Sequence, residues 1–181
     1  IKYLNKIRSL LLVKLKKLAK NKKITFSNYH TYIDDKKHQN IQWELAKYFR
    51  DKKLHLICFE GIREFLYSYF GQSVLIQKKP FLRIARPFKI EDNIGFHKDT
   101  IYGQSPYEMS IHVPLMSLGN KSCLKFAKNS HLLNDKKIQF YKSKSFFKKG
   151  SKQHKLGKPY EPKKIIKNKY NEKALPLKYG E

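Results

Sequence analysis

The sequence predicts an α+β protein in which helices come first and short strands follow. Apolar residues recur at helical spacing through residue 71, which indicates amphipathic helices. From residue 73 onward the apolar stretches become short and strand-like, and Pro80 and Pro87 punctuate the first of them. Helices followed by a run of strands favour a β-sandwich or barrel behind a helical lead.

The first helix is expected over residues 1–20. Apolar side chains repeat there at helical spacing, and lysines fill the other faces. The repeat consists of Leu4, Ile7, Leu11, Leu15 and Leu18. Such a helix either packs on its own domain or rests, as a basic amphipathic helix, on a membrane surface or a partner. Packing on the domain is the favoured interpretation.

Two more helices are expected before the strands. The second runs through NIQWELAKYFRDK, residues 40–52, and the third through LHLICFEGIREFLYSYFG, residues 54–71. Gly71 provides a C-terminal stop for the third helix. The helical lead is placed at residues 1–53 and the second domain at residues 54–181.

Three stretches are expected to contain strands, at residues 73–88, 108–118 and 122–133, and the last of them runs into a turn. In the second stretch Met109, Ile111, Val113 and Leu115 lie on one face, and Ser110 and His112 lie on the other. The apolar alternation returns at residues 174–181 and stops at a turn.

Residues 135–173 are strongly polar and rich in lysine. A disordered linker is one interpretation, but aromatic and apolar residues in the segment argue for partial docking. These are Phe140, Tyr141, Phe146, Phe147, Tyr160, Ile165 and Ile166. We interpret the segment as a long surface insertion between strands, of the kind that often covers a binding site.

The formal net charge is +26, yet only five of the 40 basic residues are arginines. Arginine makes bidentate contacts to phosphate and guanine, whereas lysine acts mainly as a point charge. The favoured interpretation is therefore compositional, with lysines on solvated faces and non-specific attraction to polyanions at low salt. No specific nucleic-acid partner is expected.

Cys58 and Cys123 are far apart and lack metal-type spacing, so no disulfide framework is expected. No stretch approaches the roughly 20 apolar residues of a membrane-spanning helix, and the basic N-terminus lacks the pattern of a signal peptide. A cytoplasmic protein is expected. Because the chain begins with Ile1 and stops at a turn at Glu181, both ends are expected to be truncated.

The candidate chemistry lies in IGFHKDTIYGQ, residues 94–104, where His97 precedes Asp99 by two positions. Side chains at i and i+2 on an extended strand project to the same side, and Lys98 then points away. Two histidines and one carboxylate on one face of an iron ion leave open positions for a co-substrate and oxygen. The motif would supply two of these three ligands.

The chain carries in order the motifs PFLRIARP, GFHKDTIYG, EMSIHVPL, SCLKFAKNSH and LPLKYGE. This order resembles the phytanoyl-CoA dioxygenase-like group of iron(II)- and 2-oxoglutarate-dependent oxygenases, and it looks closest to relatives associated with bacterial carbohydrate-biosynthesis clusters. The resemblance covers residues 54–181, with a gap across the insertion. It implies a double-stranded β-helix, a jelly roll with the N-terminal helices packed outside, and it makes the insertion a candidate lid.

Carried over by position, the resemblance makes His97 and Asp99 the ligands of Fe(II). His131 matches the family's turn histidine, which is usually not a ligand. The family's distal histidine and the arginine that pairs with 2-oxoglutarate follow a turn matched here by residues 177–181, so both are expected beyond the chain end. No arginine follows Arg86, which leaves open whether this fragment is active by itself.

Five further residues are candidates for the co-substrate or substrate pocket, namely Arg83, Arg86, Tyr102, Gln104 and His112. A guanidinium group suits a carboxylate, so either arginine fits 2-oxoglutarate or a substrate. The alternative is an ion pair with Glu91 or Asp92. His112 either lines the pocket or is a satisfied structural histidine, which is favoured, and His154 is expected to be solvated.

The predicted function is that of a hydroxylase-type oxygenase using Fe(II) and the co-substrate 2-oxoglutarate. Its expected substrate is a small metabolite of carbohydrate biosynthesis, anionic or sugar-linked. The alternative is a non-catalytic basic jelly-roll protein that binds polyanions or nucleic acid. The pattern names neither the substrate nor the oligomeric state.

Overall fold

The protein forms two compact units in a computed structural model. Residues 1–86, together with Gly180, make up the helical unit, and residues 87–179 belong to the second unit. The structure describes residues 1–78, 80–89, 92–93, 96–102, 105, 107–133, 140–142, 163–165 and 170–180, with the backbone alone at 101–102, 140–142 and 163–165. Over this part of the chain, no helix has both the length and the apolar character needed to cross a bilayer.

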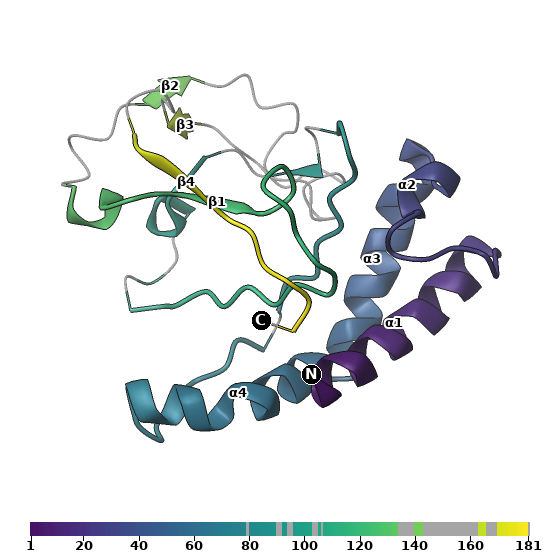
Figure 1. Cartoon of the computed structure of the whole chain (residues 1–181), viewed down its shortest axis with the longest axis horizontal. Coiled ribbons are helices and arrows are strands. Elements are labelled where there is room, and N and C mark those ends of the chain that lie inside the picture. The colour runs from purple at the N-terminus through teal and green to yellow at the C-terminus, as the bar shows by residue number, and fades with distance from the viewer. Residues whose placement is uncertain are drawn as a thin grey trace. The chain divides into compact units, whose positions relative to one another are not determined.

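Four helices are described in the helical unit: α1 (Lys2–Ala19), α2 (Tyr29–Tyr32), α3 (Asp35–Asp51) and α4 (Leu54–Phe70). The three long helices predicted from apolar periodicity are confirmed. Figure 1 shows α1 beside α3, and α4 packs against both. Because α4 and the residues that follow it as far as Arg86 belong to this unit, it extends beyond the helical lead placed at residues 1–53.

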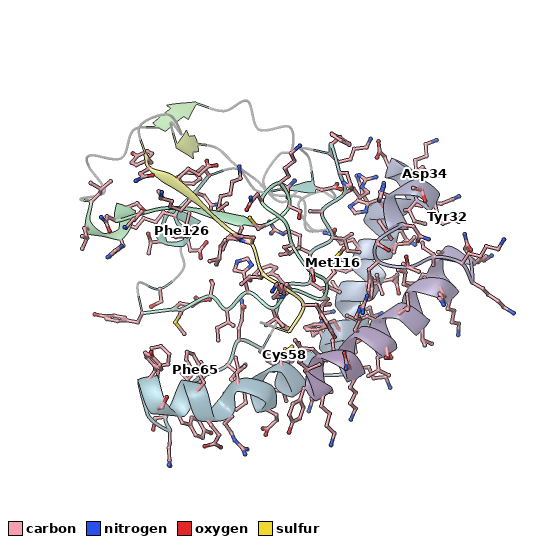
Figure 2. The ribbon with its side chains drawn as sticks, in the orientation of Figure 1. Tyr32, Asp34, Cys58, Phe65, Met116 and Phe126 are labelled. Carbon is pink, nitrogen blue, oxygen red and sulfur yellow. The ribbon has the colours of Figure 1, made fainter. Side chains whose placement is uncertain are left out.

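The ends of the helices follow local chemistry. Helix α3 begins at Asp35, five residues before the predicted start at residue 40, because Asp34 caps it. Figure 2 shows Asp34 at this end of the helix. Asp34 Oδ1 accepts a hydrogen bond from the backbone N–H of Lys37 at 2.8 Å, as an N-cap does, and this bond lowers the pKa of Asp34. At the end of α4, Gly71 has a φ of 73°, which costs glycine little, so the predicted stop is confirmed.

The core of the helical unit is built from one apolar row on each long helix. The buried side chains are Ile7, Leu11 and Leu15 of α1, Ile41, Leu45 and Phe49 of α3, and Leu54 and Leu66 of α4. Residues three and four positions apart lie on the same face of a helix, which explains the single row. The apolar face of α1 is therefore inside the unit, as predicted, while Lys2, Lys6 and Lys17 stay exposed.

One polar contact lies inside this core. The Tyr29 hydroxyl and His38 Nδ1 are 2.9 Å apart, and both side chains are buried. The hydrogen bond joins the short helix α2 to α3, and it compensates two polar groups for the loss of water.

The strand predicted within residues 73–88 is wrong, since the described residues of this stretch belong to no β-ladder. Burial still alternates near its end, where Leu82, Ile84 and Arg86 are more buried than their neighbours. The extended backbone packs on α3 instead, and the Ile84 N–H donates a hydrogen bond to Gln42 Oε1 at 3.3 Å. The alternation reflects packing on a helix and not pairing in a sheet.

Two short antiparallel ladders are described in the second unit. They pair β1 (Leu124–Ala127) with β4 (Glu172–Leu175) and β2 (Phe140–Lys142) with β3 (Lys163–Ile165). Lys125 Nζ and Glu172 Oε1 lie 2.9 Å apart across the first ladder, and hydrogen bonding to this carboxylate raises the pKa of Lys125. The strand and turn predicted within residues 122–133 are confirmed as β1 and the 3-10 helix η3 (Ser130–Leu132).

The strand predicted at residues 108–118 is also wrong. Its described backbone joins no ladder and is paired only through an isolated bridge between Leu118 and Leu177. Met109 and Ile111, on the apolar face of the predicted strand, are 52% and 47% exposed. Most of the predicted insertion lies outside the described residues, so the jelly roll and the lid stay predictions.

Leu11→Ala is expected to lower the free energy of unfolding by about 2–5 kcal/mol, because truncating a buried leucine leaves a cavity. Val13→Ala is the matched control on the same helix, since this side chain is 70% exposed, and it is expected to change stability by less than about 0.5 kcal/mol. Urea denaturation followed by circular dichroism measures both. Equal losses in the two variants would contradict the placement of the buried face of α1.

Candidate functional site

His97 and Asp99 converge in the second unit. His97 Nε2 lies 3.2 Å from Asp99 Oδ1, and the two side chains are 29% and 54% exposed. An imidazole nitrogen and a carboxylate oxygen therefore meet at a position that solvent and small ligands can reach.

The convergence does not come from an extended strand, as the sequence analysis expected. Asp99 is the first residue of the 3-10 helix η2 (Asp99–Tyr102), and His97 precedes it in irregular backbone. The chain turns at Asp99, and the carboxylate still comes within reach of the imidazole two residues earlier.

The carboxylate of Asp99 has a contact at each oxygen. Oδ1 faces His97, and Oδ2 accepts a hydrogen bond from the Ser110 hydroxyl at 3.2 Å. Ser110 belongs to residues 108–118, so this segment reaches the motif although it forms no strand. A hydrogen bond of this kind orients a carboxylate ligand in many metal sites.

An aromatic contact fixes the other side of the motif. Phe96, immediately before His97, stacks on Tyr170, with ring centroids 6.3 Å apart and ring planes 28° apart. Tyr170 lies two residues before β4, so the contact ties the motif to the segment leading into the first ladder. Such ring pairs contribute about 0.5–1.5 kcal/mol beyond the area they bury.

Thr100, which follows Asp99 in the sequence, has a hydroxyl group without a hydrogen-bond partner among the described residues. Its hydroxyl oxygen is buried. Buried polar atoms are usually paired, so this hydroxyl is an exception among the described residues.

The separation of the two donor atoms suits neighbouring ligands of one metal ion. Metal bonds to histidine nitrogen and carboxylate oxygen are about 2.0–2.2 Å long, so two of them at a right angle hold their donor atoms about 3 Å apart. The observed separation is 3.2 Å, which is also that of a direct ion pair between the two side chains. The donor types and their separation are compatible with two positions of a site made of two histidines and one carboxylate.

A third donor is not found in the part of the chain that the structure describes, because no group of three or more His, Cys, Asp or Glu side chains there can hold a metal ion. His112 and His131 are both exposed, and neither completes the pair. His154, Gln104 and the side chain of Tyr102 lie outside the described residues.

The two candidate arginines differ in their surroundings. The Arg86 side chain is 3% exposed, and its Nη1 donates to Asp35 Oδ1 of α3 at 2.7 Å within the helical unit. This ion pair anchors the extended stretch on α3 and gives Arg86 a structural role. Arg83 is exposed.

Two residues that contact candidate site residues, Ser110 and Asp35, were not predicted from the sequence. The alternation in residues 108–118 placed Ser110 on one face, but nothing in the pattern indicated that it reaches Asp99. Asp35 lies 51 positions from Arg86, and no local signal links the two.

Comparisons with protein-family models, with curated proteins and with solved structures find no match for this chain. The geometry around His97 and Asp99 is therefore what supports a proposed function.

Arg86→Gln is expected to lower the free energy of unfolding by about 1–3 kcal/mol, because it removes a hydrogen bond between charged groups. The loss stays below that of a fully buried pair because the Asp35 side chain is 61% exposed and water solvates it. Arg83→Gln is the matched control, with an expected change under about 0.5 kcal/mol. In chemical denaturation, the double variant Asp35→Asn/Arg86→Gln should lose little more free energy of unfolding than Arg86→Gln alone. If the losses of the two single variants add fully in the double variant, the ion pair is contradicted.

Proposed function

We propose that this chain is part of an iron(II)- and 2-oxoglutarate-dependent oxygenase of the hydroxylase type, built on a double-stranded β-helix. The observation that supports the proposal is the 3.2 Å approach of His97 Nε2 to Asp99 Oδ1, with the second carboxylate oxygen held by Ser110. This arrangement offers two ligands of the donor types that iron takes in such enzymes.

Each residue has a distinct role in the proposal. The imidazole of His97 and the carboxylate of Asp99 would hold Fe(II), and Ser110 would keep the carboxylate in its binding orientation. Bound iron, together with 2-oxoglutarate and dioxygen, supplies the oxidising power that replaces a substrate C–H bond by C–OH while 2-oxoglutarate yields succinate and carbon dioxide. The protein positions the substrate and shields the reacting centre.

The proposed substrate is a small metabolite of carbohydrate biosynthesis, anionic or sugar-linked. The lysines of residues 135–173 motivate the choice of an anionic substrate, and these residues serve as the lid in the proposal. We also propose a cytoplasmic location, in keeping with the free thiols of Cys58 and Cys123.

His97→Ala and Asp99→Ala are each expected to weaken Fe(II) binding at least tenfold, because each removes one ligand. Ser110→Ala is expected to weaken it about tenfold, since outer hydrogen bonds to ligands typically contribute 10–100-fold. Glu108→Ala removes an exposed carboxylate nearby in the sequence and is the matched control, with unchanged affinity. Anaerobic titration calorimetry measures all four variants.

Two results would count against the proposal in different ways. If Asp99→Ala binds Fe(II) as tightly as the parent chain, the metal centre is misplaced. If Fe(II) binds through His97 and Asp99 but 2-oxoglutarate does not bind to the iron-loaded chain, the metal centre stands and the oxygenase assignment of this chain fails. A non-catalytic scaffold would then be the better description.

A further inference from the structure

A hollow lined by lysines lies between α1 and α3 in the helical unit. Its volume is about 330 Å³, and its lining residues are Lys14, Glu44, Lys47, Tyr48, Asp51 and Lys52. Three cationic side chains therefore border one concave surface. The hollow is lined only by residues of the helical unit, whereas the residues of the proposed metal centre belong to the second unit.

Aromatic side chains accompany these lysines. Lys14 Nζ lies 5.6 Å from the centre of the Tyr48 ring, within the range of a cation–π contact. The single tryptophan of the chain, Trp43, is 38% exposed and lies four positions before Lys47 on α3, so the two share a helix face. Tyr48 is the aromatic residue in the lining of the hollow, and Trp43 lies outside this lining on the same helix.

The charge around the hollow favours an anionic ligand. In residues 1–86, lysines and arginines outnumber aspartates and glutamates by 20 to 6. The lining itself carries three lysines against two carboxylates, Glu44 and Asp51, and Arg50 Nε lies 3.7 Å from Asp51.

Three arginines of the helical unit have partners within that unit. Arg8 lies over the Phe26 ring at 5.8 Å, and Arg63 Nη1 lies 3.0 Å from Glu60 Oε2; Arg86 pairs with Asp35 as described above. The cations at the hollow are all lysines, which act as point charges and lack the fork that reads a base edge. They suit phosphate groups and not a particular base sequence.

A bilayer surface fits this site less well than a strand of nucleic acid. A helix that binds a membrane inserts an apolar face, but the apolar row of α1 is buried in the core. Lysines beside an aromatic ring, here Tyr48, instead suit a single strand of nucleic acid, whose phosphates bind at cations and whose bases pack against rings.

We propose that the hollow between α1 and α3 binds single-stranded nucleic acid without sequence preference. The phosphates lie at Lys14, Lys47 and Lys52, and a base packs beside Tyr48. This binding is independent of the proposed oxygenase activity, since it uses none of the residues of the metal centre.

Fluorescence titration with a single-stranded oligothymidylate, longer than the roughly 4–16 nucleotides that one binding surface covers, tests the site in the full chain. Replacing Lys14, Lys47 and Lys52 together by Gln is expected to weaken binding at least tenfold and to reduce the slope of log affinity against log salt by about 2. The same replacement at Lys121, Lys128 and Lys173, which are exposed in the second unit, makes an equal change in charge. This control triple is expected to stay within about threefold of the parent.

Single variants separate the hollow from diffuse charge. Glu44→Gln is expected to tighten binding severalfold because it removes an opposing charge. Tyr48→Leu is expected to weaken binding about tenfold, while Tyr48→Phe, which keeps the ring, retains it. Circular dichroism confirms that each variant is folded.

Three results would overturn the proposal. The first is that the parent chain does not bind the oligonucleotide at low salt, and the second is that both lysine triples lose the same affinity for it. The third is tighter binding to phosphatidylserine vesicles than to the oligonucleotide, with a blue shift of Trp43 emission. The last result would identify an anionic bilayer as the ligand.

Discussion

The burial of one apolar row from each long helix is the constraint on which the helical unit depends. Ile7, Leu11 and Leu15 turn one side of α1 inward, and this leaves its lysines on the outside. The seam between α1 and α3 then carries Lys14 opposite Lys47 and Lys52 around one hollow. A surface that looks like a consequence of lysine-rich composition is thus arranged by the apolar residues beneath it.

The candidate metal centre is held by individual side-chain contacts instead of a buried apolar row, because few of its residues are deeply buried. Asp99 is positioned by contacts at both of its carboxylate oxygens, and Phe96 holds the adjacent backbone through its ring contact with Tyr170. Three segments that are distant in sequence therefore define one small group of side chains. Such a site relies on specific contacts in the folded chain, so a change at residue 110 or 170 acts on the site without removing a ligand.

The predictable parts of this protein are those in which a pattern and its physical cause are both local. Apolar periodicity predicted the three long helices, and Gly71 predicted where α4 ends, because both effects act within a few residues. The strand-like pattern of residues 73–88 did not indicate what this stretch packs on, and its partner is α3 instead of another strand. The pairing of Arg86 with Asp35 and the contact of Ser110 with Asp99 bridge distant segments, which no spacing rule describes. The placement of His97 near Asp99 was expected from their separation by two positions, although the backbone that brings them together is a 3-10 turn.

The ladder between β1 and β4 bears on how the chain folds. It joins residues 124–127 to residues 172–175, with all of residues 128–171 between them. Closing such a loop costs conformational entropy that grows with its length, and contacts between distant segments slow folding. The helices rely on contacts among residues that a ribosome delivers first. The helical unit can therefore assemble while β4 is still being synthesised, and the two units acquire their structure in the order in which they are made.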